Sequence, residues 1–215
     1  MHISARAAAV AISLGSIAAP ALAGGYTEGP DLSNDRLAPT AIALDSGSNV
    51  VLATMGYTGG VLDRDFFTIT VPTGFQLDQL VLGLATQVGG GGSFVGMQAG
   101  AVLTVDPDTI GSGAALLGWH LYTSADKGTN ILDEIGGGPD KIGFSGPLPA
   151  GAYTFWVQEL TPSFPGEPYP PFPYEFDFRV GQVPEPSALL LAAAGLVMVW
   201  RRARRAGSAA LSGAR

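Results

Sequence analysis

The sequence contains no cysteine and only two histidines, and these shortages exclude several kinds of chemistry. Without cysteine the chain forms no disulfide, has no thiol nucleophile and offers no thiolate to zinc. His2 lies in a segment that we expect to be removed, which leaves His120 as the one imidazole for a Ser-His-Asp site or a metal site. Because His120 lies within an apolar strand candidate, we expect a structural histidine and a protein that is not an enzyme.

Basic residues are also scarce in the central part of the chain. Between residues 24 and 186, five basic residues stand against all 18 acidic residues, which gives this body a net charge of −13. Such a body has no basic patch to release counterions from phosphates, so we expect neither nucleic acid nor an anionic membrane surface as its partner. A body of about 160 residues is long enough for one domain held together by its core alone.

Residues 1–23 have the features of a secretory signal peptide. A weakly positive start is followed by an apolar run over residues 7–19 and by the small-x-small sequence Ala21-Leu22-Ala23. This pattern predicts cleavage between Ala23 and Gly24. An N-terminal helix of the fold is the alternative, but the run is apolar on every side, whereas a surface helix has a polar face.

The chain ends in a three-part segment, residues 183–215. Its first part is Val183-Pro184-Glu185-Pro186, where two prolines keep the backbone extended and accessible to the groove of an enzyme. Residues 188–200 are uncharged and predict a helix of about 20 Å, shorter than a hydrocarbon core of about 30 Å, so we expect only weak and transient membrane anchoring. A basic cluster then holds that end on the cytoplasmic side: Arg201, Arg202, Arg204 and Arg205.

This three-part segment resembles the PEP-CTERM sorting signal of exported bacterial proteins. The resemblance implies processing by an exosortase, a membrane-embedded enzyme that cuts near the motif, and a link to exopolysaccharide and biofilm. Residues 206–215 depart from the pattern because they continue past the arginines. An ordinary tail-anchored helix is the alternative, which the short apolar span disfavours. We therefore expect signal peptidase and exosortase as partners during export, and a final location at the cell surface or outside the cell.

Between these ends, the composition predicts an all-β domain over residues 24–182. The chain has 31 glycines and 16 prolines, and no long amphipathic helix interrupts its short alternating runs. We expect an antiparallel β-sandwich or jelly roll of about nine strands, preceded by a polar leader over residues 24–40. The expected strands are 40–44, 49–55, 65–71, 77–84, 94–99, 101–105, 116–122, 152–160 and 174–180, with a short helical turn at 131–135.

Two motifs in the body resemble the bacterial pre-peptidase C-terminal domains. They are residues 63–72, Asp-Arg-Asp-Phe-Phe-Thr-Ile-Thr-Val-Pro, and residues 148–157, Leu-Pro-Ala-Gly-Ala-Tyr-Thr-Phe-Trp-Val. In that family an Asp-rich entry leads into one strand and a glycine turn leads into a late strand. The resemblance implies a small jelly-roll accessory domain of a secreted protein.

Carboxylates are the main candidate ligands in the body. Asp63 and Asp65, or Asp106 and Asp108, lie in loops at strand ends, where hard oxygen ligands suit Ca²⁺. Exposed turn aspartates are the alternative for both pairs, and neither pair has the spacing of an EF-hand. A glycosidase dyad would need two carboxyl groups at a set separation, which the sequence does not fix.

These features favour one function and leave two alternatives. The favoured function is a non-catalytic structural or adhesive β-sandwich at the cell surface or in the extracellular matrix, with exopolysaccharide as a partner. The first alternative is a carbohydrate-binding or carbohydrate-active module that stacks sugars on Trp119, Trp156 or Tyr169. The second is a calcium-dependent adhesin. Apart from this Ca²⁺, we expect no cofactor.

Overall fold

The computed structural model describes residues 24–58, 61–89, 92–109, 111–160 and 171–184, together with Gly195, Val197 and Trp200. The expected signal peptide, Tyr169, Glu185, Pro186 and the arginine cluster lie outside these residues. Gly195, Val197 and Trp200 are helical, and the rest of the expected C-terminal helix lies outside the described part. Within the described part, no helix has both the length and the apolar character needed to cross a membrane.

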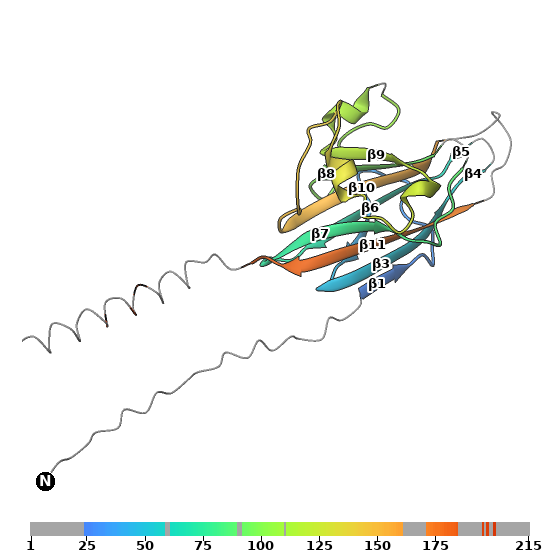
Figure 1. Ribbon diagram of the computed structural model, residues 1–215. Coiled ribbons are helices and arrows are strands. Elements are labelled where there is room, and N and C mark those ends of the chain that lie inside the picture. Colours follow the sequence, from blue (N-terminus) through green and yellow to red (C-terminus); the bar gives the residue numbers. More distant parts are fainter. Residues whose placement is uncertain are drawn as a thin grey trace, which may run out of the picture.

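Two larger sheets and one small hairpin make up the described strands (Figure 1). The four-stranded sheet has the order β1 (Gly24–Thr27), β3 (Gly47–Met55), β11 (Phe172–Gln182) and β7 (Phe75–Leu82). The five-stranded sheet has the order β2 (Thr40–Ala43), β6 (Arg64–Val71), β10 (Gly151–Glu159), β8 (Ser93–Ala99) and β9 (Gly118–Tyr122). The hairpin is formed by β4 (Tyr57–Thr58) and β5 (Val61–Leu62), and the short helices are η1 (Ser112–Ala115), η2 (Ser124–Asp126) and α1 (Leu132–Gly136).

The two larger sheets pack face to face around an aromatic core. The ring of Phe178 on β11 meets the rings of Phe67 on β6 and Phe155 on β10, with centroid distances of 6.2 and 5.3 Å. Edge-to-face contacts of this kind add to the free energy gained by burying the rings. The expected alternation on β11 is confirmed, because the residues predicted to point inward are all buried: Tyr174, Phe176, Phe178 and Val180.

The all-β prediction is confirmed, but the prediction of a wholly antiparallel sandwich is wrong at two sheet edges. Strand β1 pairs in parallel with β3, and β2 pairs in parallel with β6. The first of these strands lies within residues 24–40, which we expected to form a polar leader. Strands β10 and β11 each insert between two earlier strands of their sheets.

A second apolar layer covers the outer face of the five-stranded sheet. Residues 101–105, which we expected to form a strand, are irregular and follow Gly100, whose φ of 118° interrupts an extended chain. Leu103 and Val105 are instead buried with Phe66 and Trp156 on that face. The other eight expected strands occur with ends that differ by no more than two residues, and α1 occupies the expected helical turn.

Candidate functional site

One carboxylate lies inside the sandwich, at the start of β6. Side chains alternate along a strand, so Asp65 shares its face with Phe67 and Ile69, which are core residues. Asp65 is 0% exposed, and its Oδ2 accepts a hydrogen bond of 2.8 Å from the hydroxyl of Tyr174 on the opposite sheet. Its Oδ1 is buried and has no hydrogen-bond partner.

The loop after β1 brings two more carboxylates to Asp65. Leu32 anchors this loop because it is 1% exposed within the core, and the N–H of Phe66 donates to the carbonyl of Ser33 at 2.8 Å. The side chain of Glu28 is fixed by hydrogen bonds: its Oε1 accepts from the N–H of Leu32 at 2.9 Å. Its Oε2 accepts from the N–H and the hydroxyl of Thr54, at 2.8 and 2.9 Å.

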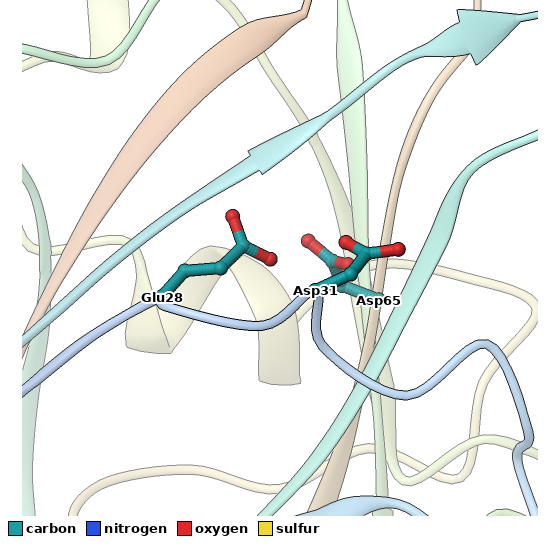
Figure 2. A group of neighbouring side chains, drawn as sticks. All are labelled: Glu28, Asp31 and Asp65. Atoms are coloured by element: carbon teal, nitrogen blue, oxygen red, sulfur yellow. The ribbon is translucent and has the colours of Figure 1, made fainter.

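Glu28, Asp31 and Asp65 therefore lie together, and we call these three residues the acidic cluster. One carboxylate oxygen from each lies within 4.8 Å of the others, and Figure 2 shows the three carboxyl groups converging. The cluster runs from the surface inward, since Asp31 is exposed, Glu28 is half-buried and Asp65 is buried. Three carboxylates at this spacing offer oxygen ligands to a hard cation.

The electrostatics of the acidic cluster reflect burial and like charge. The pKa of Asp65 is raised to about 8: burial is the largest cause, the charges of Asp63, Glu28 and Asp31 add to it, and the hydrogen bond from Tyr174 opposes it. Burial and the neighbouring Asp31 charge raise the pKa of Asp63 to about 6. Burial, together with a hydrogen bond to Glu28, also raises the pKa of Asp31. Each shift means that ionisation at this place is costly.

The two carboxylate pairs that we predicted as Ca²⁺ ligands have different surroundings in the structure. Asp63 lies beside the acidic cluster, half-buried, with an Oδ1 that has no hydrogen-bond partner, but it is not one of the three converging groups. Asp108 is instead neutralised by Arg64, whose Nη2 lies 2.6 Å from its Oδ1, and this pairing lowers the pKa of Asp108. Asp106 accepts a hydrogen bond from the backbone N–H of Asp108 at 3.2 Å, as in an ordinary turn.

Sequence reasoning missed Glu28 and Asp31. Both lie in the segment that we expected to be a leader, in the sequence Glu-Gly-Pro-Asp. The available indication was two acidic residues three positions apart around a Gly-Pro turn, followed by the lone apolar Leu32 that anchors the loop. Nothing in that pattern identifies β6 as the element on which the loop packs.

His120 lies on β9, as expected from its apolar context. Its Nε2 is 3.8 Å from a carboxylate oxygen of Asp126, and burial lowers its pKa. No second imidazole exists in the body to complete a metal site, because the other histidine of the chain is His2.

A groove with a volume of about 460 Å³ lies on the outer face of the five-stranded sheet. It brings together Trp119 and Trp156, two of the three aromatic residues that we predicted as sugar platforms. Trp156 is only 5% exposed. The indole N–H of Trp119 donates to the carbonyl of Asp140 at 3.0 Å, and the ammonium of Lys141 lies 4.9 Å from the ring centroid. Trp119, which is half-buried, therefore already contacts Asp140 and Lys141.

Comparison with known proteins identifies a sorting motif in the C-terminal segment. Residues 182–205 match the PEP-CTERM protein-sorting motif, which begins at the last residue of β11. No curated protein and no solved structure matches the chain, so the resemblance to pre-peptidase C-terminal domains gains no support. The chain carries a PEP-CTERM protein-sorting motif, which implies export, a membrane-anchored precursor and processing by an exosortase.

Proposed function

We propose that this chain is an exported protein whose β-sandwich has a structural or adhesive role, without catalysis, at the cell surface or in the extracellular matrix. The observation that carries the proposal is the sorting motif at residues 182–205. Because the motif starts where β11 ends, a cut within it leaves every strand of the sandwich in the delivered product. Apart from its first residue, Gln182, the sorting motif therefore lies outside the strands of the sandwich.

The proposed processing involves two enzymes. Signal peptidase cuts before Gly24, and exosortase cuts near Pro184 and Glu185, while the short apolar helix holds the precursor at the membrane. Loss of the C-terminal arginines then delivers a strongly acidic body, since residues 24–186 carry a net charge of −13. Such a body is suited to a hydrated matrix, where exopolysaccharide is the proposed partner and like charge keeps the copies soluble.

Mass spectrometry of a double variant tests the processing. Pro184→Ala with Glu185→Ala, made in the full chain and expressed in a bacterium that has an exosortase, should lose the C-terminal cut and keep the N-terminal cut. The intact mass of the product then includes the apolar helix and the arginines. Glu134→Ala, an exposed change in α1, serves as the control and should be trimmed normally. Normal trimming of the double variant would remove the proposal.

Deletion of the gene tests the role of the delivered body. We expect a deletion strain to show weaker attachment to surfaces or a thinner extracellular matrix, with growth unchanged. A strain whose matrix and attachment match those of the parent would contradict the structural or adhesive role while leaving the sorting intact.

A sugar-binding role is a second candidate, and the groove that unites Trp119 and Trp156 favours it. Leu121 and Leu160, which are 41% and 38% exposed, also line the groove, so its lining is largely apolar. We therefore expect a sugar to bind with the apolar face of its pyranose ring against this lining. Screening of the full chain on a glycan array tests this candidate. An array with no bound glycan would eliminate it.

A further inference from the structure

We propose that Glu28, Asp31 and Asp65 form a Ca²⁺ site that ties the loop after β1 to the start of β6. This proposal does not depend on the sorting motif. It concerns the folded body alone and holds or fails independently of how the chain is exported.

The unpaired oxygen of Asp65 is the observation that lifts this cluster above a chance gathering of acidic residues. Other buried polar side chains of the body are well bonded: the amide of Asn49 donates to the carbonyls of Asp45, Gly47 and Phe178. Asp65 Oδ1, by contrast, is one of three buried side-chain atoms in the described residues that have no hydrogen-bond partner, and Asp63 Oδ1 is another. A buried carboxylate oxygen without a donor costs free energy unless a cation binds it.

Among the described residues, no cationic side chain is one of the charged groups that shift the pKa of Asp31, Asp63 or Asp65. Four of the five basic residues of the body are bonded elsewhere. Arg36 donates to the carbonyls of Leu103 and Thr104, and Lys141 donates to the carbonyls of Trp119, Glu134 and Ile135. Arg64 donates to the side chains of Asp108 and Gln158. Arg179 donates to the side chains of Asp177 and Gln79. The countercharge for the acidic cluster must therefore come from a proton or from an ion in solution.

The donor set favours Ca²⁺ over softer metals. Ca²⁺ takes six to eight oxygen ligands in flexible geometry, whereas zinc, copper and nickel favour nitrogen or sulfur donors that this cluster lacks. The acidic cluster supplies three carboxylates, and backbone carbonyls or water complete the shell. Because Asp31 is exposed and Asp65 is buried, an ion enters from the Asp31 side and settles against the unpaired oxygen.

Calcium titration of the full chain tests the site. The protein is purified in a mild detergent, stripped with EDTA and titrated with CaCl₂ at pH 7.5 by calorimetry. We expect a dissociation constant of about 10⁻⁴ to 10⁻³ M, as in extracellular calcium modules. At a concentration of about 100 times the dissociation constant, Ca²⁺ should raise the Tm by roughly 5–10 °C.

Three isosteric variants separate the site from a general effect of charge. Asp31→Asn should weaken Ca²⁺ binding at least about tenfold, since it removes one of three anionic ligands. Asp65→Asn should abolish the rise in Tm, since it removes the buried carboxylate whose Oδ1 has no hydrogen-bond partner. Asp133→Asn makes the same charge change in α1, outside the acidic cluster, and should bind as the original chain does.

Several outcomes would overturn the proposal. These are no heat and no rise in Tm with Ca²⁺, an equal response to Mg²⁺ or to NaCl of matched ionic strength, or an equal loss of binding in Asp31→Asn and Asp133→Asn. A variant that fails to fold is recognised by its far-UV circular dichroism. The calcium response of the original chain then decides the question by itself.

Discussion

The hydroxyl of Tyr174 on β11 donates a hydrogen bond of 2.8 Å to Oδ2 of Asp65 on β6, and both side chains are buried. This bond joins the two sheets across the core. The second oxygen of Asp65 is buried and has no hydrogen-bond partner. The packing of the sandwich and the chemistry of the cluster therefore meet in one pair of residues.

Tyr174→Phe should destabilise the fold more strongly at high pH than at low pH. A hydrogen bond to a charged group is worth about 1.5–3 kcal/mol and a neutral one about 0.5–1.5 kcal/mol, so the loss should be larger at pH 9, where Asp65 is ionised, than at pH 6. Urea unfolding in EDTA at both pH values measures the difference. Tyr153→Phe removes a hydroxyl that donates to the carbonyl of Pro149 at 2.9 Å, and its cost should be the same at both pH values. Equal costs for Tyr174→Phe would contradict the prediction.

Asp65→Asn should change the pH dependence of stability in EDTA. The pKa of Asp65 in the folded protein, about 8, lies above its ordinary value of 3.8, so the folded state holds more protons between these values. The free energy of unfolding should therefore fall as the pH rises from about 4 to 8, with a slope of up to about 1.4 kcal/mol per pH unit. The difference between the original chain and Asp65→Asn isolates this slope, and a flat difference curve would refute the assignment.

Gly118→Ala should destabilise the sandwich because a Cβ at this position meets the backbone carbonyl of Ile135, which cannot rotate away. Forcing atoms into a packed interior costs about 1–3 kcal/mol. The matched control is Gly29→Ala, since a Cβ there meets no atom within 4 Å. Thermal unfolding of both variants checks the prediction. A Tm for Gly118→Ala equal to that of the control would mean that the carbonyl of Ile135 in α1 does not lie against Gly118 of β9.

Phe178→Ala should cost about 3–5 kcal/mol in the free energy of unfolding, as expected for removal of a large core ring. The ring of Phe178 contacts those of Phe67, Phe155 and Phe176, so its loss opens a cavity between the two sheets. Leu52→Ala on the neighbouring strand β3 removes a side chain that is 38% exposed and should cost much less. Denaturant unfolding measures both. Similar costs would show that the two sheets do not share this core.

Local pattern was enough to predict most strands, because alternation reports which face of a strand is buried. It failed at residues 101–105, where apolar residues are buried in an irregular segment: Leu103 and Val105 cover the outer face of the sheet. The parallel pairing of β1 with β3 was also missed, since a four-residue strand of Gly-Gly-Tyr-Thr has almost no alternation to detect.

Only part of the candidate site could be predicted from the sequence, for a related reason. Asp65 was identified because it opens a strong strand pattern, and the sequence offered Asp63 as its partner. Its actual partners, Glu28 and Asp31, come from a segment more than 30 positions earlier, which Leu32 anchors in the core. Contacts between distant segments depend on the packing of the sheets, and a short motif carries no information about that packing.

The pairing register of β3 also decides how the body responds to tension. Gly24 and Phe178 both lie opposite Asn49, and β1 and β11 run in opposite directions beside β3, so the start of β1 and the end of β11 lie at the same pole of the sheet (Figure 1). A pull applied between these two ends opens the ladders one hydrogen bond at a time instead of loading them all in shear. The sandwich should therefore unzip under low force when it is stretched between its two ends.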